Sequence, residues 1–108
     1  MNKTPFFVII TEEQEANEMP THVSKTILLK PARKAFDKMD MKTRKRLIDG
    51  IKGLEQIPAV GDIKPLSGII GKYRLRIGSY RVIYSYGTDS ELIILYVEDI
   101  GSRGDIYK

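Results

Sequence analysis

The C-terminal half of the chain contains three runs of β-forming residues joined by very short links. The runs lie at residues 72–77, 80–86 and 91–97 and contain many valine, isoleucine and tyrosine residues. Gly78-Ser79 joins the first run to the second, and residues 87–90 join the second to the third. Links of this length and composition are typical of β-hairpins, and strands joined so tightly must be antiparallel. The sequence therefore predicts an antiparallel meander.

The preceding residues supply elements that can cover one face of this sheet. Residues 23–29 form a candidate strand, and Pro31 is well placed to begin a helix over residues 31–39. Asp40 is a candidate cap for a second helix over residues 41–56. The apolar residues of that second helix fall on one stripe, formed by Leu47, Ile48, Ile51 and Leu54.

These elements together predict an α+β domain with the order β-α-α-β-β-β. Residues 57–71 contain two prolines and three glycines, so we expect them to form loop and turn. The first strand is expected to join the meander in an antiparallel sheet of about four strands. Both N-terminal helices then pack on one face of that sheet.

Composition excludes several kinds of functional site. The chain has no cysteine, which excludes disulfides and Cys-ligated metals, and it has one histidine, His22. One histidine excludes a multi-histidine metal site and permits a Ser-His-Asp triad only if His22 serves it. The longest apolar runs, residues 6–10 and 92–97, are far too short to span a bilayer. With no signal-peptide pattern either, the expected location is the cytoplasm.

Charge is distributed unevenly along the chain. The net charge is +4, but residues 1–21 sum to −3 and residues 22–108 sum to +7. We therefore expect an acidic N-terminal extension, residues 1–21, followed by one basic domain, residues 22–108. Three interpretations of the extension stay open: a solvated segment without a fixed fold, a segment that folds back on the basic surface, or residues upstream of a start at Met19.

The basic domain concentrates positive charge on one predicted sheet face. Side chains alternate along a strand, so Lys72, Arg74 and Arg76 share one face while the residues between them share the other. Arg81 follows just after the hairpin. Like charges this close repel unless an anion or a carboxylate lies between them. Two interpretations follow, a solvated basic face and a binding site for an anionic partner such as RNA.

The residue pattern of the C-terminal half resembles that of the RelE/ParE superfamily of bacterial toxins. The resemblance lies in LSG at residues 66–68, KYRLRIGSYRVIY at residues 72–84 and GSRGDIY at residues 101–107. It extends over residues 24–108, where a strand, two helices, a loop and three strands follow in the order of that superfamily. It implies the toxin of a type II toxin–antitoxin pair, held silent in a hetero-oligomer by a cognate antitoxin.

In the RelE branch, the resemblance implies a ribosome-dependent endoribonuclease that cleaves mRNA and inhibits translation. The ribose 2′-hydroxyl attacks the neighbouring phosphate and leaves a 2′,3′-cyclic phosphate and a 5′-hydroxyl. This reaction needs cations at the phosphate and a group that accepts a proton, and it needs no metal or other cofactor.

By position, the resemblance assigns the catalytic site to five residues, namely Arg74, Arg76, Arg81, Arg103 and Tyr107. It assigns RNA binding to Lys72, Arg74, Arg76 and Arg81. Arg81 and Arg103 would hold the phosphate, because a planar guanidinium binds two oxygens at once. Tyr107 would stack on a base, orient the 2′-hydroxyl or anchor the C-terminus against the sheet.

The sequence departs from the RelE pattern at two places. Some members have lysine where Arg74 and Arg76 stand, and arginine cannot act as a base because it keeps its proton. The base is then Lys72 or Tyr107, or catalysis is electrostatic alone. Ser102 stands where the Gly-x-Arg turn often has histidine or lysine, which weakens the prediction of a strong nuclease.

Two other classes remain open alongside the nuclease. The ParE branch has the same fold but implies DNA gyrase as the target, without nuclease chemistry, and a third option is a relative that only binds its antitoxin. Glu98 and Asp99 are expected either to dampen the local positive field or to face solvent. The basic outer face of residues 41–56 is interpreted either as a contact surface for an acidic antitoxin or as an ordinary solvated helix face.

Overall fold

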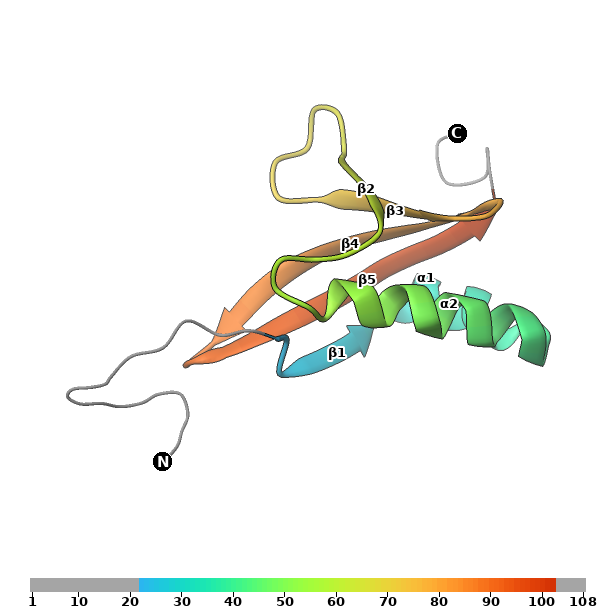
Figure 1. The fold of residues 1–108 in the computed structure, drawn as a ribbon, viewed down its shortest axis with the longest axis horizontal. Helices are drawn as coiled ribbons and strands as arrows, with labels where there is room; N and C mark the ends of the chain where they lie inside the picture. Colours follow the sequence, from blue (N-terminus) through green and yellow to red (C-terminus); the bar gives the residue numbers. More distant parts are fainter. Residues whose placement is uncertain (1–21, 103–108) are drawn as a thin grey trace.

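The computed structural model of this chain describes residues 22–102. Its elements are β1 (Lys25–Leu28), α1 (Lys30–Asp37), α2 (Met41–Leu54), β2 (Asp62–Pro65), β3 (Tyr73–Ile77), β4 (Tyr80–Asp89) and β5 (Leu92–Ser102). Figure 1 shows both helices on one side of the sheet and the segment between β2 and β3 on the other side. This architecture confirms the predicted α+β class with the helices on one face.

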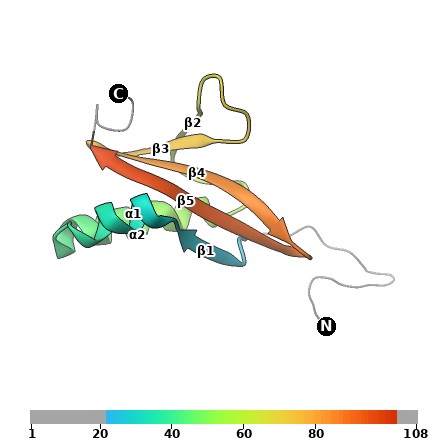
Figure 2. The ribbon, with the colours of Figure 1, turned by 180° about the vertical axis from the view of Figure 1, so that it is seen from behind.

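The sheet has five strands in the order β1-β5-β4-β3-β2. The neighbours β5-β4-β3-β2 are antiparallel, as the predicted meander requires, whereas β1 runs parallel to β5. The sheet is therefore mixed and one strand larger than predicted. The added strand is β2, which lies inside the predicted loop and pairs with β3 along its whole length. Seen from behind in Figure 2, β5 crosses the molecule between β1 and β4.

The two hairpins differ in how closely they follow the sequence. Gly78 adopts a positive φ of 59° in the predicted two-residue link between β3 and β4. The second turn is shorter than predicted, because β4 continues through Asp89 and the chain reverses at Ser90, which has a φ of 56°. Gly87 lies within the strand instead of the turn. A Cβ there would approach the Tyr96 ring to 2.8 Å, so the glycine makes room for that ring.

The second helix begins at the predicted residue, the first begins one residue earlier than predicted, and side-chain hydrogen bonds join the two helices where they meet. Pro31 lies in the first turn of α1, and the Asp40 carboxylate caps α2 by accepting from the Thr43 backbone N–H at 2.9 Å. Arg44 donates to the Phe36 and Asp37 carbonyls at 3.2 and 2.8 Å. These carbonyls at the C-terminal end of α1 have no partner within the helix, and Arg44 supplies one. In the described residues 22–102, no helix is long and apolar enough to cross a membrane.

The core lies between α2 and the facing side of the sheet. Leu47, Ile51 and Leu54 of α2 are buried, as three members of the predicted stripe should be, while Ile48 is 42% exposed. They belong to one cluster with alternate residues of the strands, including Leu75, Val82, Tyr84, Leu95 and Val97. The predicted alternation along β3 is therefore confirmed, and the basic residues of β3 lie on the face away from the helices.

Gly53 marks a close approach of α2 to the chain that leaves it. A Cβ at Gly53 would lie 2.4 Å from the Val60 carbonyl oxygen, and the Val60 N–H donates to the Gly53 carbonyl at 2.9 Å. Alanine usually stabilises a helix interior relative to glycine by about 0.5–1 kcal/mol. Here we expect Gly53→Ala to destabilise the protein by about 1–3 kcal/mol, because backbone must move. Chemical denaturation measures this difference.

Gly50→Ala is the matched control on the same helix. A Cβ at residue 50 would lie 2.3 Å from Cδ1 of Ile77. The Ile77 side chain can change rotamer to make room, whereas the Val60 backbone carbonyl cannot. We expect the loss at Gly50 to be less than half of the loss at Gly53. Equal losses would contradict this explanation of Gly53.

Candidate functional site

The basic residues predicted for the site gather on the sheet face opposite the helices. Arg74 and Arg76 of β3 alternate with the buried Leu75. Arg81 of β4 is directly opposite Arg76 in the register, and Ile83 is opposite Arg74. Directly opposed residues of antiparallel strands have Cβ atoms about 4.5–5.5 Å apart. The structure therefore places two arginines, Arg76 and Arg81, side by side on neighbouring strands.

Carboxylates from other strands lie against several of these cations. Asp62 of β2 is 3.2 Å from Arg76 Nε and 3.8 Å from Arg74 Nη1. Sequence reasoning missed Asp62, because the residue fell in a predicted loop and β2 had no visible pattern. Lys72 Nζ donates to Glu98 Oε1 at 2.6 Å, which corresponds to the dampening of the local field expected of Glu98.

Arg74 and Arg76 differ in how far their side chains are buried. The Arg74 side chain is 8% exposed, and its Nη1 has no hydrogen-bond partner within the described part of the chain. The Arg76 side chain is 43% exposed. Arg76 can therefore contact a ligand directly at the surface, whereas Arg74 contributes its charge from beneath the surface.

The Asp62–Arg74 pair makes a testable contribution to stability. Removing one partner of a buried ion pair leaves the other charge uncompensated, which costs most when the remaining charge is buried. Arg74 is the buried member, whereas Asp62 is half-exposed and also contacts Arg76. Because Asp62 is 53% exposed, we expect Asp62→Ala to cost only about 1–2 kcal/mol. Arg74→Met is expected to cost less than Asp62→Ala. Urea denaturation of both variants measures the order, and a larger loss in Arg74→Met would contradict this account.

A hollow of about 450 Å³ adjoins the basic face on the side of the loop that joins β2 to β3. Its lining residues are Leu66, Ser67, Ile69, Lys72, Ile83, Glu98 and Asp99. Glu98 accepts from Ser85 Oγ at 2.5 Å as well as from Lys72, and its side chain is 18% exposed. Burial raises the pKa of Glu98, but the hydrogen bonds from Lys72 and Ser85 outweigh it and hold that pKa below its ordinary value.

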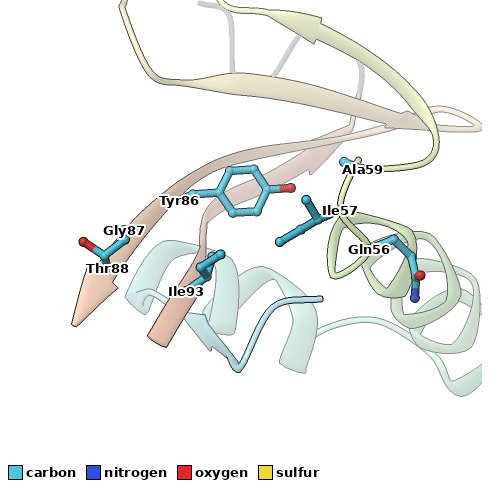
Figure 3. Close-up of a pocket in the computed structure, with 7 residues that line it drawn as sticks. All are labelled: Gln56, Ile57, Ala59, Tyr86, Gly87, Thr88 and Ile93. Carbon is cyan, nitrogen blue, oxygen red and sulfur yellow. The ribbon is translucent and has the colours of Figure 1, made fainter. Parts of the chain in front are cut away.

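A second hollow, of about 460 Å³, lies on the helix side of the sheet. Figure 3 shows the Tyr86 ring pointing toward Ile57 across it, and its lining is mostly apolar. Burial raises the pKa of the Tyr86 hydroxyl. That hydroxyl donates to the Leu54 carbonyl at 2.8 Å, so it links β4 to the C-terminal end of α2.

Two predicted site residues, Arg103 and Tyr107, lie outside the described residues. Ser102, the last residue of β5, is paired with Tyr80, so the described chain ends next to the strand that carries Arg81. Among residues 22–102, no three His, Cys, Asp or Glu side chains lie together as a metal site would require.

Three solved structures that are similar to this fold are toxin–antitoxin complexes. The archaeal RelE–RelB complex from Pyrococcus horikoshii matches with a TM-score of 0.60 and 25% identity, covering 78% of this chain and 98% of that chain. The RelBE2 toxin–antitoxin complex from Mycobacterium tuberculosis matches with a TM-score of 0.58 and 22% identity, covering 82% and 98%. The RelB–RelE complex from Methanococcus jannaschii matches with a TM-score of 0.56 and 24% identity, covering 75% and 94%.

The fold is thus that of the RelE toxins, which agrees with the class predicted from the sequence. The profile of a family described as the ParE toxin of the type II toxin–antitoxin system parDE matches residues 27–107. The chain therefore belongs to this ParE toxin family, within the RelE/ParE superfamily of type II toxins. A search of curated proteins finds no significant match.

Proposed function

We propose that this toxin is a ribosome-dependent endoribonuclease that cleaves mRNA. The main support is the opposed pair Arg76 and Arg81, which share the face of the sheet that borders a hollow. Two guanidinium groups on neighbouring strands form a positively charged site that attracts an anion, and Asp62 offsets part of the Arg76 charge there. An RNA phosphate is such an anion, and it accepts two hydrogen bonds from each planar guanidinium.

The arginines then stabilise the transition state. The 2′-oxygen bonds to phosphorus while the bond from phosphorus to the 5′-oxygen breaks, and negative charge builds on the phosphate oxygens. Arg76, Arg81 and Arg103 hold those oxygens, and Arg74 adds its buried charge from behind them. Tyr107 stacks on a base or orients the 2′-hydroxyl. Lys72 contributes to RNA binding at the rim of the hollow.

A cognate antitoxin is the second proposed partner, because the solved relatives are complexes of RelE with RelB. The outer face of α2 presents Lys42, Lys45 and Arg46 to solvent. Arg44 belongs to the same basic run but is bound to the end of α1. The exposed lysines and Arg46 suit an acidic segment of an antitoxin helix or strand.

Inhibition of DNA gyrase is a second candidate function, and the match to the ParE family favours it. In that case the basic face binds a protein, and no proton acceptor is needed on it. The two functions predict opposite outcomes for the cleavage of ribosome-bound mRNA and for the supercoiling of DNA by gyrase.

One pair of reactions distinguishes these functions. The purified full-length chain is added to a translation reaction and, in parallel, to a gyrase supercoiling reaction. Cleavage that requires both ribosomes and message supports the nuclease. Blocked supercoiling with intact message overturns it in favour of gyrase inhibition, and no effect in either reaction overturns both in favour of a relative that only binds its antitoxin.

A further inference from the structure

The proposed reaction needs a group that accepts the proton of the 2′-hydroxyl. The arginines cannot do so, because guanidinium has no acceptor site. Lys72 was a candidate from the sequence, but its Nζ donates to Glu98 at 2.6 Å. An ammonium group that donates in an ion pair has no lone pair to offer. Tyr107, the other candidate from the sequence, lies outside the described residues, so another acceptor is sought within residues 22–102.

We propose that Glu98 is this proton acceptor and that Lys72 and Ser85 position it, a role that depends on the proposed nuclease function. Each carboxylate oxygen of Glu98 receives one hydrogen bond, Oε1 from Lys72 and Oε2 from Ser85. A carboxylate oxygen has a second acceptor site, so both oxygens keep capacity for a substrate hydroxyl. Glu98 lines the hollow, so a hydroxyl entering the hollow can reach it.

The sheet register places Glu98 on the same face as the arginines. Ile83 of β4 is opposite Arg74 on one side and opposite Asp99 on the other. Arg81 and Ser85 lie two residues before and after Ile83, so all three share one face. Glu98 contacts Ser85, whereas Arg76 is opposite Arg81. A nucleotide lying over Ile83 therefore has the carboxylate at one end and the arginine pair at the other.

The surroundings of Glu98 keep it ionised at neutral pH. Lys72, just before β3, contacts it directly, and Arg74 on β3, Arg81 on β4 and the adjacent Asp99 on β5 lie on the same face of the sheet. The loop of residues 66–71 has no charge. Asp99 is occupied locally, because its Oδ1 accepts from the Ile100 N–H at 2.9 Å. Lys72 stabilises the charged carboxylate at the shortest distance of these groups, 2.6 Å.

The proton balance of the step is complete without any co-reactant. Glu98 takes the proton from the 2′-hydroxyl as the 2′-oxygen bonds to phosphorus and the bond from phosphorus to the 5′-oxygen breaks. The departing 5′-oxygen takes a proton from water, and Glu98 returns its own proton to solvent. The products are a 2′,3′-cyclic phosphate and a 5′-hydroxyl, so the net change is a proton moved from the 2′- to the 5′-oxygen.

The test is single-turnover cleavage of ribosome-bound mRNA by the full chain and its variants. Glu98→Gln is expected to lower the rate by about 10²- to 10⁴-fold, the range typical of a lost general base. Glu98→Asp keeps a carboxylate and should recover part of that loss. Glu91→Gln, an exposed carboxylate at the turn between β4 and β5, is the matched control and should cleave like the parent. Thermal unfolding shows whether each variant is folded.

The pH profile of the parent gives a second readout that needs no variant. With Glu98 as base, the rate should stay level between about pH 6 and 9, because a carboxylate is fully ionised there. A lysine or tyrosine base would instead raise the rate about tenfold per pH unit across that range. A rising profile, or a folded Glu98→Gln within threefold of the parent, overturns the assignment of Glu98 alone. A parent that does not cleave overturns the proposed function itself.

Discussion

Replacing Arg81 with alanine is expected to lower the rate of ribosome-dependent mRNA cleavage by about 10²- to 10³-fold, the loss typical of one missing donor to a charged transition state. Arg81 lies directly opposite Arg76, so its removal leaves one guanidinium where the proposed site has two. The charge builds on the phosphate only as the reaction proceeds. The loss should therefore appear in the cleavage rate at saturating ribosomes more than in binding.

Arg33→Ala is the matched control for this experiment. Arg33 is exposed on α1, and the helices lie on the opposite side of the sheet from the arginine pair. Both substitutions remove one positive charge, so a general effect of charge on ribosome binding would slow both. We expect Arg33→Ala to cleave within threefold of the parent. Arg81→Ala protein as active as the parent would refute the placement of the site.

Leu47→Ala is expected to destabilise the fold by about 2–5 kcal/mol, the range typical of truncating a fully buried leucine. Leu47 is completely buried in the cluster that joins α2 to the sheet. Truncation removes apolar contacts and leaves a cavity that a sheet and a helix cannot close fully. The free energy of unfolding, measured by chemical denaturation, gives the loss directly.

Ile48→Ala, one residue further along α2, separates burial from helix propensity. Ile48 is 42% exposed, so its truncation should cost well under half of the loss at Leu47. Equal losses at the two positions would mean that α2 does not pack on the sheet through Leu47.

The meander was predictable because its information is local. The two-residue link Gly78-Ser79 fixes the pairing of β3 with β4, and alternation along β3 fixes which side chains share a face. The position of β1 was less accessible. It pairs in parallel with β5, where Lys25 is opposite Ile94, 69 residues further along the sequence, and no turn joins the two strands directly.

The missed strand β2 illustrates a different limit. Asp62–Pro65 is a four-residue edge strand that ends in proline and follows a glycine with a φ of 145°. These residues are typical of loops, and the strand exists because Ile63 packs against the core and the backbone pairs with β3. Tertiary contacts therefore determined the conformation of a segment whose composition favoured a loop.

The candidate site was predictable in its cations, whereas Asp62 was missed and for Glu98 the sequence left two roles open. Alternation alone placed Arg74 and Arg76 on one face, and the hairpin added Arg81. Asp62 and Glu98 come from other strands, so their contacts with Arg76 and Lys72 depend on strand order and register. The burial of Arg74 could not be foreseen either, because exposed and buried arginines look alike in a sequence.

The central claim is tested most directly by a message that lacks one hydroxyl. Once the cleavage site is mapped, the ribosome-bound mRNA is compared with the same mRNA carrying a 2′-deoxynucleotide immediately 5′ of the scissile phosphate. We expect the all-ribose message to be cut to a 2′,3′-cyclic phosphate and a 5′-hydroxyl, while the substituted message stays intact. Equal cutting of both messages, or an intact all-ribose message with full ribosome occupancy, would contradict that claim.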